Sequence, residues 1–305
     1  MKRILIINKA QYGEHIDSYK YCKYLNKYYE VNYIGFDFGF PKIEDETNVI
    51  YIKRKKNKVY GMINFIREII KEVNSNNYDV TFLVYFSLCS LISIFSTINF
   101  LDIRTGKISK NIFIVRAYNI LLLFESRFFK KITIISESLR KHLLIPKNKS
   151  SILPLGSDIE ICKNKKYSEV KLFYIGTLSH RNIHHTIEGL DMYIRDGGDQ
   201  RITYDIFGDG REEDVNKLKD SIEKFSLKDN IIYHGRKSHS EIESYFNECN
   251  VGVSYIPITE YYNSQPPTKT FEYLAAGMIT IATETDENKL IINKHNGVLH
   301  KDSPA

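Results

Sequence analysis

The chain has 305 residues, 43% of them hydrophobic and 26% charged, a composition typical of a soluble globular protein large enough for two cores. Its four cysteines lie far apart, which excludes the common disulfide and zinc spacings and suits a reducing, cytoplasmic compartment. The net charge of +6 is uneven: residues 1–157 hold 25 Lys/Arg and 13 Asp/Glu, giving +12, and residues 158–305 hold 18 and 24, giving −6.

The basic first half indicates a polyanionic partner, and we expect the surface of an anionic membrane, to which each nearby basic residue adds about 1 kcal/mol of binding. The expected docking element is the basic run at 53–58 with the amphipathic segment Gly61–Val73 that follows it. Nucleic acid is not expected as a partner, because the sequence has no RNP-like motif, zinc finger or helix-turn-helix pattern.

Strand-like apolar segments alternate with helical patterns from the start of the chain. Amphipathic helical patterns such as Ser18–Tyr29 lie between the expected strands. The strands expected in the first half are Arg3–Asn8, Val31–Phe36, Val49–Ile52, Val80–Tyr85, Phe100–Ile103, Ile132–Ile135 and Ser151–Leu153.

The segment Val80–Leu101 carries no charge over 22 residues, a length that could span a membrane. Serines interrupt it and recur on one helical face. We therefore interpret it as a buried strand followed by a buried helix, and we expect no insertion into the bilayer.

A second series of strands follows the polar stretch 158–169. Its members are Lys171–Ile175, Thr203–Phe207, Asn230–His234, Val251–Ser254 and Ile279–Thr283. Alternation of this kind implies parallel sheets covered by helices on both faces. The sequence thus predicts an α/β protein with two doubly wound domains, residues 1–157 and 158–305, each with its ligand site at the carboxyl ends of the strands.

The segment PPTKTFEYLAAGMITIAT, residues 266–283, predicts a helix that begins after Pro266–Pro267 and ends at Gly277. We expect its core-facing residues to be Phe271, Leu274 and Ala275.

Two cations are expected at one edge of the second sheet. Lys269 lies in the first turn of this helix, where a cation opposes the helix dipole at a cost of about 0.3–1 kcal/mol. Arg181 lies at the start of the helix after strand Lys171–Ile175. Helix N-termini favour anions, and Glu272 follows Lys269 by one turn, so the three residues predict a site for a diphosphate and a ribose.

Other site motifs are weak or absent. Gly208-Asp209-Gly210 lacks the third glycine of the dinucleotide fingerprint, so NAD is not expected. His180, His184 and His185 have zinc-like spacing without a further ligand type, and no Asp-x-Asp pair occurs, so no metal is expected. Gly13, between the first strand and the first helix, either lets a ligand approach the backbone or forms a plain turn.

Longer segments carry a family resemblance over nearly the whole chain, strongest over Leu172–Leu299. They read FYIGTLSHRNIHHTIEGL, YDIFGDG, IIYHGRKSHSEIESYFNECNVGVSYIP and PPTKTFEYLAAGMITIATET, with FLDIRTG, ITIISESLRKHL and ILPLGSD in the first half. The chain resembles the retaining GT-B glycosyltransferases of family 4. This resemblance implies two Rossmann-like domains facing across a cleft, a nucleotide-sugar donor and no metal or other cofactor.

On the donor side, the resemblance implies that Arg181 and Lys269 hold the diphosphate and stabilise the departing nucleotide, an electrostatic role. It implies that Glu272 binds the ribose hydroxyls. The loop residues Arg236 and Lys237 would flank the base.

One donor contact departs from the family pattern. The family's glutamate pair is spaced E-x7-E, but Ser264 stands eight residues before Glu272. Contacts to the donor sugar are therefore expected from elsewhere, such as the backbone between Ser264 and Thr268.

On the acceptor side, the resemblance implies that Gly13, Asp102 and Arg104 face the reacting sugar and the acceptor, with Asp102 among the catalytic residues. Thr105 replaces the family's second aspartate, which leaves open which residue assists the acceptor. The chain also ends where family members continue into further helices, which favours a truncated second domain.

Three functions remain open on the sequence. The first is a glycosyltransferase that builds a surface polysaccharide on a lipid-linked saccharide, peripheral on the inner face of the membrane. The second is a nucleotide-sugar 2-epimerase, which would act on the nucleotide sugar without an acceptor. The third is an impaired, non-catalytic partner protein, suggested by Ser264, Thr105 and the short C-terminus.

Overall fold

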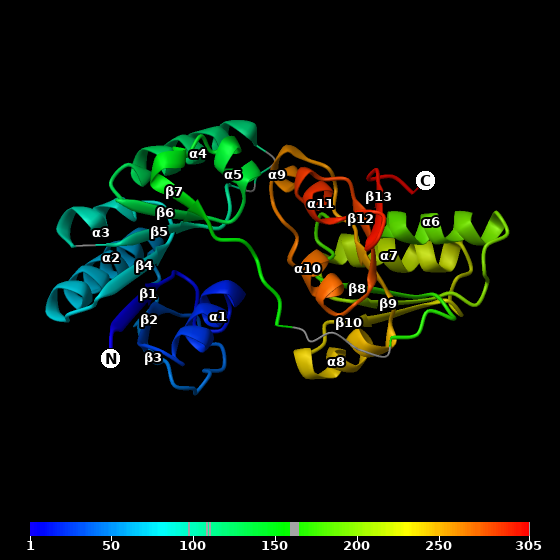
Figure 1. Cartoon of the computed structure of the whole chain (residues 1–305), viewed down its shortest axis with the longest axis horizontal. Coiled ribbons are helices and arrows are strands. Elements are labelled where there is room, and N and C mark those ends of the chain that lie inside the picture. Colours follow the sequence, from blue (N-terminus) through cyan, green and yellow to red (C-terminus); the bar gives the residue numbers. More distant parts are fainter. Residues whose placement is uncertain (97, 108, 110, 159–164, 305) are drawn as a thin grey trace. The chain divides into compact units, whose positions relative to one another are not determined.

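The computed structural model describes residues 1–96, 98–107, 109, 111–158 and 165–304. It divides into two compact units, Met1–Pro154 and Leu155–Ala305 (Figure 1). Each unit is built on one parallel β-sheet.

The first unit has a seven-stranded sheet in the order β3-β2-β1-β4-β5-β6-β7. The strands are β1 Arg3–Ile7, β2 Glu30–Asp37, β3 Asn48–Lys53, β4 Val80–Val84, β5 Phe100–Ile103, β6 Lys131–Ile134 and β7 Ser150–Ile152. The helices are α1 Ile16–Leu25, α2 Lys58–Ser75, α3 Ser90–Phe95, α4 Ile112–Ser126, α5 Glu137–His142 and the 3₁₀ turn η1 Lys147–Lys149.

The second unit has a six-stranded sheet in the order β10-β9-β8-β11-β12-β13. The strands are β8 Lys171–Ile175, β9 Thr203–Phe207, β10 Ile231–Gly235, β11 Val251–Ser254, β12 Ile279–Thr283 and β13 Gly297–His300. The helices are α6 His184–Arg195, α7 Glu212–Lys224, α8 His239–Glu248, α9 Glu260–Asn263, α10 Thr268–Ala275 and α11 Asp286–Ile291.

The predicted doubly wound α/β architecture is confirmed in both units. All strand pairs run parallel, and the strand order reverses beside the first strand of each unit, between β1 and β4 and between β8 and β11. In doubly wound sheets, ligands bind at this point, outside the carboxyl ends of the strands. The edge strand β13 was not among the expected strands.

Two expectations about helix burial are wrong. In α10 the buried residues are Thr270, Tyr273 and Ala276, and Phe271, Leu274 and Ala275 are only partly buried. The predicted phase is off because Thr270, a polar residue, faces the core and bonds there to Ser254 and Asn288, at 2.7 and 3.0 Å between hydroxyl or amide oxygens.

The second wrong expectation concerns the helix after β4, which was expected to be buried. The short helix α3 leaves Leu91, Ile94 and Phe95 exposed. Among the described residues, no helix combines the length and the apolar character needed to cross a bilayer.

Candidate functional site

Lys269 is positioned by the buried face of α10. Tyr273, one turn on, is fully buried, and its hydroxyl accepts a hydrogen bond of 3.0 Å from the backbone N–H of Ile175 at the end of β8. This bond ties the second turn of α10 to the carboxyl end of β8. The Lys269 ammonium then lies 3.8 Å from the centre of the Tyr174 ring.

The charge of Lys269 is poorly compensated. Burial and the nearby Arg181 guanidinium hold the pKa of Lys269 well below its ordinary value of 10.5, and the Glu272 carboxylate opposes this only as the smallest of the three effects. No hydrogen bond or ion pair joins the ammonium to another described residue. The site therefore disfavours the lysine's own charge until an anion enters.

Arg181 was expected at the start of the helix after β8. It lies instead in the loop before α6, because α6 begins at His184. His180 and Asn182 on either side have positive φ values of 58° and 52°, a left-handed conformation that turns the loop sharply. The guanidinium lies 4.1 Å from the centre of the Tyr262 ring. Its Nε is buried and has no hydrogen-bond partner within the described chain.

A buried donor without a partner costs about 1–3 kcal/mol, and more when it is charged. Arg181 lies close enough to the other cation to act on it, since its charge lowers the pKa of Lys269 and also acts on the Tyr174 hydroxyl. The structure thus brings together the two cations that the sequence proposed, and it leaves both short of counter-charge.

A pocket of about 450 Å³ opens at the carboxyl ends of β8, β9 and β10; neither cation is among its lining residues, but Lys269 lies next to Gly176 of the pocket wall. Its two glycine-containing loops are in close contact, since a Cβ on Gly208 would lie 1.8 Å from the carbonyl oxygen of Gly176. Gly176 also lies close to Lys269, since a Cβ on Gly176 would lie 3.0 Å from Lys269 Nζ. The pocket is lined by Ile175, Gly176, Thr177, Phe207, Gly208, Asp209, Gly210, Arg236, Lys237 and Ile242.

Sequence reasoning missed the role of these glycines. Gly208-Asp209-Gly210 was examined only as an incomplete dinucleotide fingerprint, whereas here it packs against the loop after β8 and forms a wall of the pocket. The available signal was a pair of glycine-containing loops that both follow strands of one parallel sheet.

The other residues expected to bind the donor have different surroundings. Arg236 and Lys237 line the pocket, and the Lys237 ammonium also pairs with Glu241 at 3.1 Å. Ser264 is buried at the end of α9, and Thr268 is the partly buried first residue of α10. These four positions stay predictions, as does the ribose contact of Glu272.

Gly13 belongs to the first unit, between β1 and α1. It has a positive φ of 94°, and a Cβ there would lie 2.4 Å from Cδ1 of Ile43. The glycine is therefore required by contact with its own chain, which favours the turn interpretation over the close approach of a ligand.

Asp102 and Arg104 form an internal charge network. Asp102, on β5, is fully buried; it accepts a hydrogen bond of 2.6 Å from Thr133, and Arg104 Nε lies 3.8 Å from its other oxygen. Arg104 also donates to Asp17 at 2.9 Å and to the Leu153 carbonyl at 2.8 Å. Desolvation raises the pKa of Asp102 to about 6, against the effects of Arg104 and Thr133.

Because Asp102 is 0% exposed, its carboxylate does not reach the surface of the unit. This burial weighs against the expected direct contact between Asp102 and an acceptor, which stays a prediction. The network instead joins α1, β5, β6 and the segment after β7.

The zinc-like histidines do not form a metal centre in the described part of the chain, where no group of three or more His, Cys, Asp and Glu side chains could hold a metal ion. His185 shares a hydrogen bond of 2.8 Å with the Tyr255 hydroxyl, and the His184 ring packs edge-on against it.

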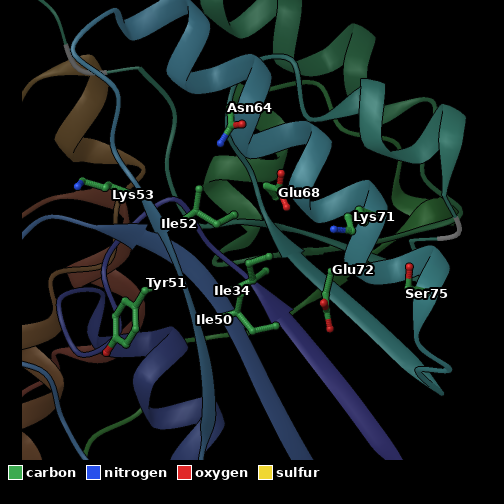
Figure 2. A pocket seen from close by; sticks show the side chains of 10 residues that line it. All are labelled: Ile34, Ile50, Tyr51, Ile52, Lys53, Asn64, Glu68, Lys71, Glu72 and Ser75. Carbon is green, nitrogen blue, oxygen red and sulfur yellow. The ribbon is translucent and has the colours of Figure 1, made fainter.

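A second pocket, of about 350 Å³, lies in the first unit between α2 and the strands β2 and β3 (Figure 2). Glu68, Lys71 and Glu72 reach it from α2, opposite the isoleucines of the strands (Figure 2). Glu72 is already engaged, since its carboxylate accepts a hydrogen bond of 2.6 Å from Tyr78. The pocket contains none of the site residues that the sequence proposed.

Comparisons with known proteins agree with this architecture. Residues 169–305 match the family model of the glycosyl transferases group 1. No curated protein matches the chain by sequence.

Solved glycosyltransferases match nearly the whole chain. HepE from Anabaena, in complex with UDP and glucose, is 12% identical with a TM-score of 0.74, over 99% of this chain and 86% of its own. A glycosyltransferase from Rickettsia africae is 15% identical with a TM-score of 0.71, over 98% and 84%. WaaG, a glycosyltransferase of lipopolysaccharide biosynthesis, is 12% identical with a TM-score of 0.66, over 98% and 86%.

These likenesses identify the two-sheet architecture as the GT-B fold. The matched segment carries the partly compensated cations and the pocket described above. The chain therefore has the GT-B fold, and its residues 169–305 match the glycosyl transferases group 1.

Proposed function

We propose that the protein transfers a sugar, with retention of configuration, from a nucleoside-diphosphate sugar to a lipid-linked saccharide during the synthesis of a surface polysaccharide. The reaction takes place at the cytoplasmic face of a membrane, on which the enzyme is peripheral, and it needs no metal ion.

The observation that carries the donor assignment is the pair of under-compensated cations beside the pocket. Arg181 has a buried N–H without a partner among the described residues, and burial together with the Arg181 charge depresses the pKa of Lys269. A diphosphate supplies both the acceptor and the negative charge. UDP and UDP-glucose, which HepE from Anabaena binds, are ligands of this kind.

The same two cations serve the chemical step. When the bond between the sugar and the diphosphate breaks, negative charge grows on the departing phosphate oxygen. Arg181 and Lys269 stabilise that charge in a site from which most water is excluded, where such interactions are stronger than in bulk water. Their charges replace the divalent ion that other transferases use.

The remaining donor contacts are those that the family resemblance suggests, and of these residues Arg236 and Lys237 line the pocket. Arg236 and Lys237 lie at its rim and contact the base, Glu272 accepts the ribose hydroxyls, and the backbone between Ser264 and Thr268 contacts the sugar. The polysaccharide role is supported by the resemblance to WaaG, which acts in lipopolysaccharide biosynthesis.

Thermal unfolding with UDP, GDP, ADP and CMP tests the donor site. A ligand at one hundred times its dissociation constant adds about 2.7 kcal/mol to the stability of the folded state, which raises Tm by several degrees. One nucleoside diphosphate is expected to raise Tm above the others. If none does, the chain is not a competent transferase and is better described as a non-catalytic partner protein.

The configuration and the reaction class need a second measurement. NMR of the purified product gives the anomeric configuration, and inversion would contradict the retaining assignment. Conversion of the nucleotide sugar to its epimer in the absence of any acceptor would make the protein an isomerase.

A further inference from the structure

An apolar stripe runs along the outer side of α4. Its members recur every three or four residues, the spacing of one helical face: Phe113, Ala117, Ile120, Phe124 and, just beyond the helix, Phe128. Phe113 is 76% exposed, Ile120 67% and Phe124 53%. Single exposed apolar residues are ordinary on protein surfaces, but a continuous stripe marks a surface that another partner covers.

The stripe cannot turn into the core, because the opposite face of α4 is anchored there. The buried Glu125 carboxylate accepts hydrogen bonds from the Tyr85 hydroxyl at 2.9 Å and from the Ser90 hydroxyl at 2.9 Å. The Tyr118 ring packs edge-on against Tyr85, and Leu122 is fully buried. The orientation of α4 is therefore fixed with its aromatic residues outward.

The surroundings of the stripe are strongly basic. Residues 107–149 contain ten Lys/Arg and two Asp/Glu, a formal charge of +8. Of the two acids, Glu125 is buried and Glu137 compensates Arg140. Arg116 and Arg127 are exposed on α4 and at its end, and Lys149 donates to the Arg127 carbonyl, which places a further ammonium there.

The segment that the sequence suggested for docking is less suitable. The apolar face of α2 packs in the core, where Gly61, Phe65, Ile66 and Ile69 are buried. Only its first turns expose apolar side chains, Val59 and Ile63 among them. The burial of this face weighs against the expectation that the amphipathic segment Gly61–Val73 meets the bilayer.

We propose that α4 is the element that enters the bilayer, lying parallel to the membrane surface with Phe113, Ile120 and Phe124 in the acyl region. The basic residues around it contact anionic headgroups. A stripe of Phe and Ile flanked by Lys and Arg is the composition of an interfacial helix, and its positive charge selects an anionic bilayer over a neutral one. The inference rests on the proposed membrane location and names the surface responsible.

The absence of tryptophan from the chain allows a direct test. A single tryptophan is introduced by Phe113→Trp on α4, or by Val59→Trp on α2 as the matched control. With vesicles of phosphatidylglycerol and phosphatidylcholine, the emission of the α4 variant is expected to shift to the blue, and that of the α2 variant to stay unchanged. A shift at α2 without one at α4 would overturn the proposal.

Polar substitutions give the size of the effect. Phe113→Ser and Ile120→Ser are each expected to lower the partition coefficient onto anionic vesicles by about tenfold, the loss of one buried apolar side chain. Val59→Ser and Ile63→Ser, equally exposed on α2, are expected to leave it unchanged. Unaltered Tm values show that all four variants fold.

Two further measurements separate this inference from its alternatives. Sedimentation of the wild type reveals a dimer if a second copy covers α4, and a dimer that the serine variants dissociate would contradict the bilayer assignment. The affinity for the nucleoside diphosphate is measured in the same samples. Its absence alongside intact vesicle binding would refute the proposed transferase site and leave the membrane surface standing.

Discussion

The two units compensate their buried charges in opposite ways. The first unit belongs to the basic half of the chain, yet its buried Arg104 is held by Asp17, Asp102 and the Leu153 carbonyl. The second belongs to the acidic half, yet Arg181 and Lys269 lack sufficient counter-charge beside a pocket. The net charge of each half therefore does not indicate which buried cations are compensated. Local contacts decide this, because electrostatic interactions in a partly desolvated site act over a few ångströms.

The largest expected effect tests whether the charges of the first unit are structural. Arg104→Met leaves the buried Asp102 and the nearby Asp17 without their cation, and removing one partner of a buried pair typically costs about 3–5 kcal/mol of the free energy of unfolding. Urea denaturation measures this loss. The exposed pair Arg201–Asp199 is the control, where Arg201→Met is expected to leave the free energy of unfolding nearly unchanged. Equal effects for the two variants would show that the internal network is not structural.

The next effect concerns nucleotide affinity in the second unit. Lys269→Met removes a charged donor worth about 3 kcal/mol, which lowers the affinity for a nucleoside diphosphate roughly 150-fold and changes the affinity for the nucleoside little. Titration calorimetry measures both. Lys289→Met, at an exposed lysine, is the control.

The same variant has an opposite effect on the free protein. The folded state binds the Lys269 proton less tightly than the unfolded state, so that stability rises with pH from the lowered pKa up to about 10.5. Methionine in its place removes this penalty, and Tm of the free protein at neutral pH is expected to increase. A lower Tm would mean that the lysine has a structural partner.

The next prediction tests the proposed contact between Glu272 and the ribose of the donor. Glu272→Ala removes hydrogen bonds to a charged group, about 1.5 kcal/mol for a partly exposed carboxylate, and lowers nucleotide affinity about tenfold. Glu272→Gln, which keeps the shape and one acceptor, loses less. Identical titration curves for wild type and Glu272→Ala would show that the carboxylate contacts no ribose.

The pH dependence of the first unit is a smaller effect. The folded pKa of Asp102 is raised to about 6, so its proton is bound more tightly in the folded state, and stability falls as the pH rises from about 4 to about 6. The change is about 1.4 kcal/mol for each pH unit within this window, and the opposing effects of Arg104 and Thr133 are already contained in the folded pKa. Asp102→Asn removes this slope in Tm against pH; a slope that persists would point to another carboxyl group.

The smallest expected effect is that of metal removal. If the two cations alone hold the diphosphate, EDTA leaves nucleotide affinity and sugar transfer unchanged. Strict dependence on Mg²⁺ or Mn²⁺ would show that Arg181 and Lys269 do not suffice.

The elements were largely predictable because apolar runs of four to six residues separated by helical patterns indicate buried parallel strands. Which face of a helix is buried was harder to predict from the sequence. In α10, both Phe271–Leu274–Ala275 and Tyr273–Ala276 recur at helical spacing, and only the partners of Thr270 on β11 and α11 decide which set is buried. The edge strand β13 gave no comparable signal.

The donor side of the site was predictable in part. Arg181, Lys269 and Glu272 follow from strand ends and helix starts, which a doubly wound sheet places on one edge. Three features were not predicted, since they depend on which loops pack together: the Tyr174 ring next to Lys269, the Tyr262 ring next to Arg181, and the glycine wall of the pocket.

The sequence by itself determined the strand–helix alternation, the two parallel sheets and the set of charged residues near their carboxyl edges, because periodicity and chain order specify these locally. Tertiary structure alone decided which charges are compensated and which apolar faces are covered. Asp17 and Arg104 meet although 87 residues separate them. Both α2 and α4 carry apolar residues at helical spacing, but Phe65, Ile66 and Ile69 of α2 are buried, whereas Phe113, Ile120 and Phe124 of α4 are exposed. A pattern gives a side chain its direction; what lies in that direction is set by the packing of distant segments.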